Sequence, residues 1–210
     1  NLNRKNGYGV RDVLIECASD CLPDPVIRAM SARLQKLADK DKDEYGRRRH
    51  LMLIESLARQ IKDAKLFEKN RIASWGKLST AAFIDIARVY LEGGDVEAAH
   101  LWLNKIPEDE TFQAYERDKL LLDLFRRQGD SEKLNDLLHR KFRSHRSMDT
   151  LQALLDVIGQ EKQDKIIVDE IALISECSAL RESDANFLIA TGKIDEAEAY
   201  LLDRADQLNR

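Results

Sequence analysis

Apolar positions follow helical spacing from the first part of the chain onward. In residues 10–21 they recur every three or four positions, which predicts an amphipathic helix with Cys17 and Cys21 buried on one face. The same spacing predicts helices over 26–37 and 51–61 and a short helix within 62–78. The polar run DKDKDE at 39–44 is expected to be a solvated loop.

The pattern becomes sharper from Ser79, in the stretch FIDIARVYLEGGDVEAAHLWL. Ser79 or Thr80 is expected to cap a helix that runs to about Glu92. Gly94 then ends that helix, because glycine adopts the left-handed conformation at little cost. Asp95 caps a following helix, so the glycine turn is a joint between two helices. It lacks the strand and the lysine of a phosphate-binding loop.

This joint recurs along the chain. Gly129 is followed by Asp130, Gly192 has Asp195 nearby, and Gly159 marks a looser version. The four glycines are 35, 30 and 33 residues apart, and two helices in about 34 residues is the tetratricopeptide period. The expected core positions are Phe83, Ile86, Ala87, Tyr90, Ala99 and Leu103, then Leu121, Leu122, Phe125, Leu134 and Leu138, then Leu151 and Leu155, and finally Ala185, Leu188, Ala197 and Leu201. In the third unit Asp164 stands where a small residue is expected.

Three longer phrases resemble a family of uncharacterised bacterial proteins that carry a domain of unknown function. They are RRHLMLIESLARQIKDAKLFE, DIARVYLEGGDVEAAHLWLNKIP and AEAYLLDRADQL. The resemblance covers nearly the whole chain and implies a cytoplasmic bacterial protein with tetratricopeptide-like helical repeats. It implies no activity and no catalytic residues.

The predicted fold is all-α, an α-solenoid of about five or six antiparallel helical hairpins. Residues 1–78 are expected to form irregular hairpins. Residues 79–210 are expected to form tetratricopeptide-like repeats continuous with them, because a single hairpin cannot bury its apolar face alone. The low content of Pro and Gly and the abundance of Leu, Ala, Glu, Lys and Arg agree with helices.

Charge is distributed unevenly over the 210 residues, whose net charge is −4. Residues 1–80 hold 17 Lys and Arg against 11 Asp and Glu, whereas residues 147–210 hold 6 against 14. No stretch is apolar enough to cross a bilayer, and three cysteines without a CxxC pair fit a reducing cytoplasm. We therefore expect a cytoplasmic protein without membrane association.

The sequence holds no catalytic motif. It lacks GxSxG, HExxH and zinc-like Cys and His spacing, and its four histidines are scattered. Acidic runs such as EDE at 108–110 fit loops and helix starts. We predict a chain that is not an enzyme and that binds no cofactor and no metal.

The predicted function is a scaffold that binds a peptide or a partner protein in a concave groove lined by the first helices of the hairpins. Helical phase gives the candidate groove residues Asp85, Arg88, Glu92, Asp123, Arg126, Arg127 and Asn186. One alternative is nucleic-acid binding through the basic residues Arg47, Arg48, Arg49, Arg140, Lys141, Arg143 and Arg146, although Phe142 among them is expected to face the core. Another is a non-catalytic arm of a larger enzyme.

Overall fold

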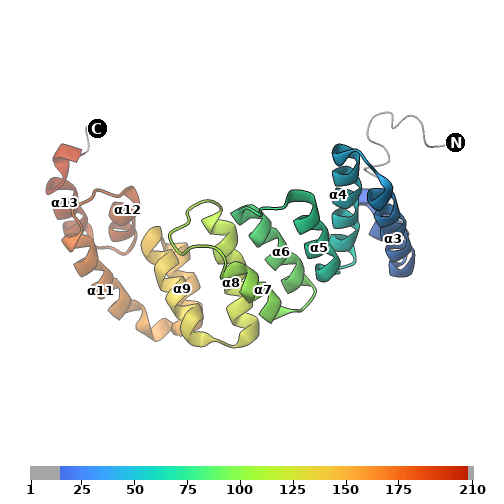
Figure 1. Cartoon of the computed structure of the whole chain (residues 1–210). Helices are drawn as coiled ribbons and strands as arrows, with labels where there is room; N and C mark the ends of the chain where they lie inside the picture. Colours follow the sequence, from blue (N-terminus) through green and yellow to red (C-terminus); the bar gives the residue numbers. More distant parts are fainter. Residues whose placement is uncertain (1–14, 208–210) are drawn as a thin grey trace. The chain divides into compact units, whose positions relative to one another are not determined.

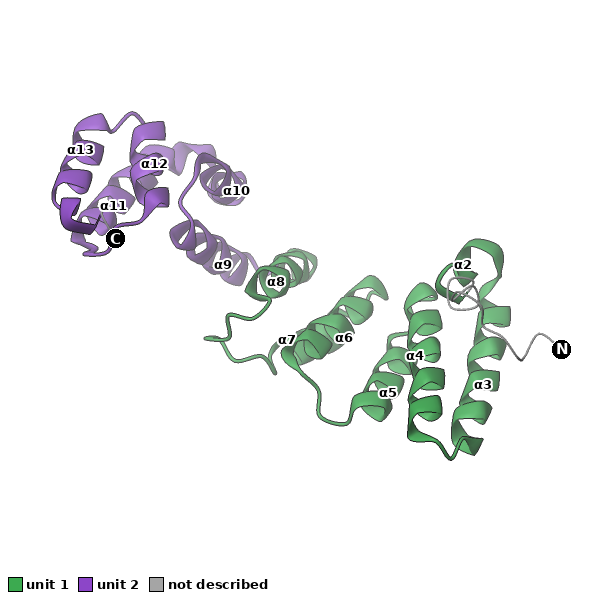
Figure 2. Cartoon of the chain, turned by 90° about the horizontal axis from the view of Figure 1, so that it is seen from above, with its two compact units in different colours: residues 1–128 green, residues 129–210 purple. Residues whose placement is uncertain are grey.

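The computed structural model describes residues 15–207, and this range is all-α. It contains twelve α-helices, two short 3-10 helices and no strand within those residues (Figure 1). The prediction of an all-α chain is therefore confirmed. The chain divides into two compact units, unit 1 at Asn1–Gln128 and unit 2 at Gly129–Arg210 (Figure 2).

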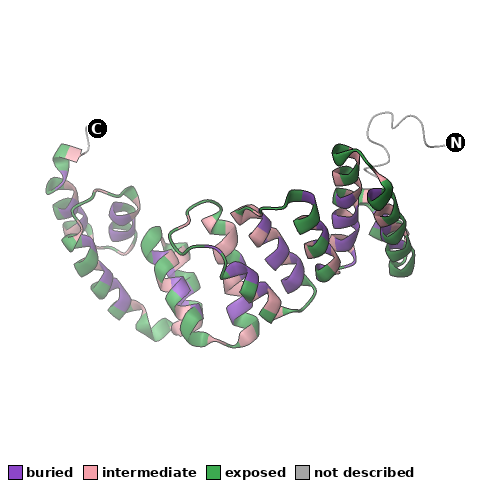
Figure 3. Ribbon diagram, in the orientation of Figure 1, coloured by how far each residue is buried: buried purple, intermediate pink, exposed green. Residues whose placement is uncertain are grey.

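Unit 1 follows a simple order of helices. They are α2 (Ala18–Cys21), α3 (Asp24–Lys40), α4 (Glu44–Gln60), α5 (Ala64–Trp75), α6 (Thr80–Glu92), α7 (Val96–Leu103) and α8 (Ala114–Gln128). Each helix from α3 to α8 packs on the next, and α6 also packs on α8. Their buried residues lie on the faces that meet, which Figure 3 shows as bands facing neighbouring helices. Burying such side chains stabilises each contact by about 1.5–3 kcal/mol per large apolar residue.

Unit 2 contains shorter and less regular elements. They are α9 (Ser131–Ser144), α10 (Met148–Ile158), η2 (Gln160–Lys162), α11 (Gln163–Glu176), α12 (Glu182–Ala190), α13 (Ile194–Leu202) and η3 (Ala205–Gln207). A capping box between Ser147 and Thr150 starts α10, and Gly159 with a φ of 106° ends it. The connection at Gly159 is thus looser than the joint at Gly94, as the sequence predicts.

The joint at Gly94 has the predicted geometry. Gly94 has a φ of 86°, and its backbone N–H donates to the Leu91 carbonyl while the Asp95 N–H donates to the Tyr90 carbonyl. These two bonds form the Schellman end of α6. The Asp95 side chain then accepts a hydrogen bond from the Ala98 N–H at 3.0 Å and so begins α7. A cap of this kind stabilises a helix by about 1 kcal/mol.

The same joint is present twice more in clear form. At Gly129 (φ 69°) the Asp130 side chain accepts from the Lys133 N–H at 3.1 Å, as predicted. Between α4 and α5 the positive φ belongs to Lys62 (53°), and the Asp63 side chain accepts from the Leu66 N–H at 3.1 Å. The repeated joint therefore begins earlier in the chain than the glycine period indicates.

Several boundaries differ from the sequence prediction. The division into compact units falls after Gln128. At 78 and 79, where the sequence predicts a change of repeat type within one continuous array, α5 and α6 pack together and Arg71 pairs with Asp85 across the connection. The loop predicted at 39–44 is only 41–43, since α3 and α4 extend into it. At the last joint Lys193 holds the N-cap position, and Asp195 lies in the first turn of α13.

The predicted core is correct at most positions and wrong at a few. Leu121 and Leu122 are only half-buried, whereas Leu120 and Leu124 are buried, so the apolar face of α8 is shifted by one residue. Asp164 is exposed and leaves the packing of α11 to Ile166 and Ile167. Phe142 is fully buried, as predicted.

The two cysteines at 17 and 21 contradict the prediction that both are buried. Both are exposed. Cys17 interrupts the helical hydrogen bonding and stands at the N-cap of α2, so the two residues do not share one continuous helix. Spacing by four positions therefore does not bring them to one face. The part of that predicted helix before residue 15 lies outside the described residues.

Candidate functional site

Four of the predicted groove residues line one hollow in unit 1, which we call the Arg127 hollow. Its volume is about 350 Å³, and its charged lining residues are Arg88, Glu92, Glu116, Lys119, Asp123 and Arg127. Leu91 and Leu120, which are almost fully buried, supply its apolar part. The hollow therefore offers an apolar floor with charges of both signs around it.

Helical register explains why these side chains meet. On α6, Arg88 and Glu92 are four positions apart, and on α8, Glu116, Asp123 and Arg127 are separated by seven and four. Such spacings place side chains on one face of a helix. Because α6 packs on α8, the two faces lie beside the same hollow.

The other three predicted groove residues lie elsewhere. Arg126 is exposed on α8 and is not among the residues that line the Arg127 hollow. Asn186 is exposed on α12 of unit 2. Asp85 lines a second hollow of about 280 Å³, which we call the Trp75 hollow, together with Arg71, Trp75, Lys77, Ser79 and Ala81. Trp75 forms a half-exposed aromatic wall there.

A network of charged side chains connects the linings of the two hollows. We call it the unit 1 network, and it contains Glu55 and Arg59 on α4, Arg71 on α5, Asp85 and Arg88 on α6, and Glu116 on α8. Arg71 joins Glu55 to Asp85 through N···O distances of 3.0 Å and 3.2 Å. Arg88 continues the network to Glu116 at 2.7 Å. Exposure rises along it from Glu55, which is buried, to Glu116, whose side chain is 41% exposed.

Glu55 is the buried end of this network. Burial raises the pKa of Glu55, while Arg71 and a hydrogen bond from the Ser74 hydroxyl oppose the rise without cancelling it. The Ser74 Oγ donates to Glu55 Oε1 at 2.9 Å. The carboxylate is therefore held in a site that favours its protonated form more than water does.

The predicted basic patch at 140–146 is wrong at Arg146. This side chain is buried, donates two hydrogen bonds to Glu170 at 2.9 Å and 2.7 Å, and donates one to Asp184 at 2.9 Å. Burial lowers the pKa of Arg146, but the hydrogen bonds to Glu170 and Asp184 raise this pKa by more than burial lowers it. The net shift of the pKa is therefore upward. Arg143 also donates to Glu170, at 2.8 Å. We call these four residues the unit 2 cluster.

The remaining basic candidates do not form one surface. Arg47, Arg48 and Arg49 are consecutive on α4, and Arg48 lies over the Trp75 ring and pairs with Glu44. Arg140 lines a shallow hollow with Asp136 and His139, and Lys141 is half-buried. Phe142 packs against Phe187 in the core, so its ring is not accessible beside Arg140 and Lys141 for stacking.

Glu116, Lys119 and Trp75 are site residues that the sequence reasoning missed. The signal for Glu116 and Lys119 was present, because both follow the helical spacing of Asp123 toward the start of α8. Trp75 had no such signal. It stands at the last position of α5, and only the packing of α5 on α6 brings it beside Asp85.

The described residues contain neither a cluster of metal-binding side chains nor a membrane-spanning helix. Within 15–207 no group of three or more His, Cys, Asp and Glu side chains gathers as a metal site would require. No helix in this range combines the length and the apolar character needed to span a membrane. Comparison of the chain with protein-family models, with curated proteins and with solved structures finds no match.

Proposed function

We propose that this chain is a helical-repeat interaction module whose unit 1 binds a peptide or a partner segment along α6 and α8. The observation that carries the proposal is the Arg127 hollow. Four residues selected by helical phase as groove residues line it together, on the helices that precede the joints at Gly94 and Gly129. An apolar floor with charged rims suits recognition of a chain segment with both kinds of side chain.

As part of this proposal, the packed helices form an α-solenoid of tetratricopeptide-like hairpins. A residue with positive φ followed by a capping aspartate recurs at Lys62, Gly94 and Gly129, with 32 and 35 residues between successive copies. A regular repeat presents equivalent faces of successive helices to the same side. In this arrangement α6 and α8 are neighbouring first helices, and the hollow between them is one step of a longer groove.

The alternative of nucleic-acid binding has less support. Its strongest stretch contains Arg146, which is buried against Glu170 and Asp184, and Phe142, which lies in the core. The phosphate backbone needs accessible bases, and a stacked base needs an accessible ring. A binding assay with labelled DNA and RNA at low salt tests this alternative, which predicts a steep loss of affinity as salt rises.

A matched pair of variants on α8 tests the proposed function. Lys119→Glu reverses an exposed charge that lines the hollow, and Arg126→Glu makes the same change on an exposed side chain of the same helix outside it. Proteins captured by the wild-type chain are compared quantitatively with those captured by each variant. We expect Lys119→Glu to lower the retained partner at least several-fold and Arg126→Glu to retain it. Equal retention by the two variants would remove the hollow as the binding surface.

A further inference from the structure

Two charged side chains at the ends of α6 have the sign that the helix dipole disfavours. Lys77 stands two residues before the N-cap Ser79, where the dipole is positive, and Glu92 is the last residue, where it is negative. The helix has no acidic residue in its first turn and no basic residue in its last turn. Within 15–207 neither Lys77 nor Glu92 forms an ion pair or a side-chain hydrogen bond.

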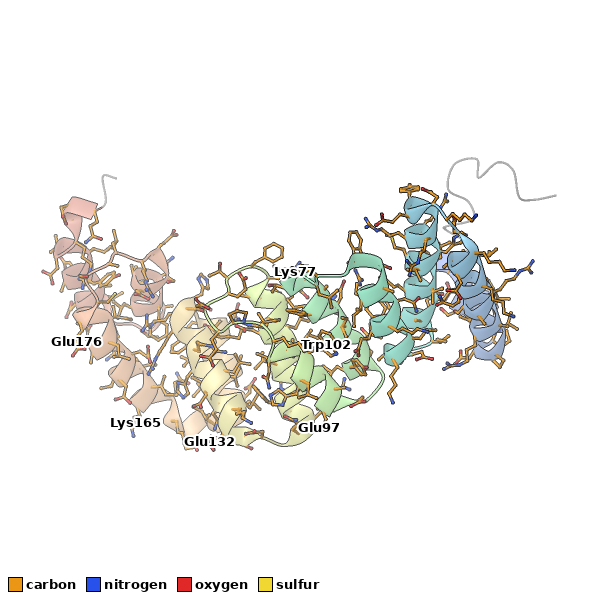
Figure 4. The ribbon with its side chains drawn as sticks, viewed as in Figure 1. Lys77, Glu97, Trp102, Glu132, Lys165 and Glu176 are labelled. Carbon is orange, nitrogen blue, oxygen red and sulfur yellow. The ribbon has the colours of Figure 1, made fainter. Side chains whose placement is uncertain are left out.

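Both of these side chains line the hollows described above. Lys77 belongs to the Trp75 hollow and Glu92 to the Arg127 hollow. One face of α6 joins the two hollows, because Ala81, Asp85 and Arg88 lead to Glu92 in steps of four, three and four residues. Figure 4 shows Lys77 at the opposite end of the α6–α7 hairpin from Glu97, an acid in the first turn of α7. On this face of α6 the terminal side chain is therefore basic at the Lys77 end and acidic at the Glu92 end.

The charges between the two ends are compensated. Asp85 pairs with Arg71 and Arg59, and Arg88 pairs with Glu116. On this face of α6 only the two ends keep charges that a ligand would neutralise, and Lys119 of α8 is a further exposed charge beside Glu92. Positions whose charge opposes the helix dipole break a local rule, and such breaks are expected at functional or strained positions. The face from Ala81 to Glu92 is about 16 Å long at 1.5 Å per helical residue. An extended peptide covers that length with about five residues.

We propose that the two hollows accept an extended peptide segment of about five residues with opposite charges at its ends. An Asp or Glu side chain lies beside Lys77 and the N-terminal end of α6, and a Lys or Arg side chain lies beside Glu92. Apolar side chains between them contact Trp75, Leu91 and Leu120. This inference rests on the proposed function, and it adds the charge pattern and the orientation of the bound segment.

Five-residue fluorescent peptides test the inference directly. All are acetylated and amidated, share a Ser and Leu core, and differ in the end residues: one acidic and one basic in either order, both acidic, both basic, or both neutral. Fluorescence anisotropy at up to millimolar protein gives the affinity of each class. We expect the wild-type chain to bind the oppositely charged class about tenfold more tightly than the others. Both orders are allowed, because an extended peptide can lie in either chain direction.

Charge reversals at the two ends should change the preferred class. Lys77→Glu should select peptides with two basic ends, and Glu92→Lys should select peptides with two acidic ends. Arg126→Glu, which lies outside this face of α6, should leave the preferred peptide class unchanged. If a charge reversal disturbs folding, the neutral variants Lys77→Met and Glu92→Gln take its place, and each should weaken the preference for oppositely charged ends. Binding of all classes with equal affinity, or a preference that the reversals leave unchanged, would overturn the charge pattern while groove binding stands. Failure of every class to bind would overturn both the inference and the proposed function.

Discussion

The unit 1 network and the unit 2 cluster are both built from Arg, Asp and Glu side chains, but these side chains differ in how far they are exposed to solvent. In unit 2, Arg146, Glu170 and Asp184 are all at most 7% exposed, and they tie the connection after α9 to α11 and α12. In unit 1, exposure rises from the buried Glu55 to Arg88 and Glu116, which border the Arg127 hollow. In unit 2 these three side chains are buried and only Arg143 is half-exposed, whereas most of the unit 1 network lies at the surface.

This difference in exposure suits the two groups of charges to different roles, a structural one in unit 2 and a binding one in unit 1. A buried charge must keep its partners, since removal of one leaves another charge unpaired in a medium of low dielectric constant. An exposed pair loses little when it opens, because water and salt replace the partner. We therefore expect the unit 2 cluster to hold the fold, and the exposed end of the unit 1 network to exchange its partners for those of a ligand.

The largest expected effect is that of Arg146→Met. This change leaves the buried carboxylates of Glu170 and Asp184 without their shared cation, and such a loss costs about 3–5 kcal/mol. Urea denaturation followed by circular dichroism measures it. The matched control is Arg143→Met, which removes a half-exposed partner of the same Glu170 and should cost less than about 1 kcal/mol. Equal losses of unfolding free energy in the two variants would show that burial does not determine how much each arginine of this cluster contributes to stability.

The second prediction concerns the pH dependence that Glu55 produces. Because burial raises the pKa of Glu55, the folded chain binds its proton more readily than the unfolded chain does. Its contribution to stability is thus greatest at acidic pH and falls as pH rises from about 4.5, the usual value, through the raised pKa of the folded state. Glu55→Gln keeps a hydrogen-bond acceptor for Ser74 and does not titrate.

The measurement is the free energy of unfolding of both chains between pH 4 and pH 8. We expect the wild-type chain to lose stability relative to Glu55→Gln as pH rises through this window. The conservative control is Asp123→Asn, which removes an exposed carboxylate paired with Arg127 and should not reproduce this trend. A relative gain of stability toward neutral pH would mean that Arg71 outweighs the burial of Glu55.

The joints between helices were predictable from sequence because they depend on neighbouring residues. A positive φ and a capping side chain act within a few positions, so Gly94 with Asp95 and Gly129 with Asp130 were identified correctly. The joint at Lys62 was missed because glycine served as the marker. Asp63, in the same position as Asp95, was the signal that remained.

The buried role of Arg146 could not be predicted, because its partners are far away in sequence. Glu170 is 24 residues from it and Asp184 is 38 residues from it, and nothing local distinguishes this arginine from the exposed Arg140. The groove residues on α6 and α8 were partly predictable, since helical phase determines which side chains share a face. Whether two faces border one hollow depends on packing, which phase alone does not give.

The smallest expected effect is that of opening the Arg88–Glu116 pair at the rim of the hollow. The two side chains are 2.7 Å apart and 30% and 41% exposed, so their coupling should be about 0.2–1 kcal/mol. A double-mutant cycle with Arg88→Met and Glu116→Gln measures it, and molar salt should reduce it further, since salt screens exposed charges. A coupling as large as the loss from Arg146→Met would make this pair a fixed part of the fold. A small, salt-sensitive coupling instead leaves Arg88 able to exchange Glu116 for a carboxylate of a bound peptide at little cost.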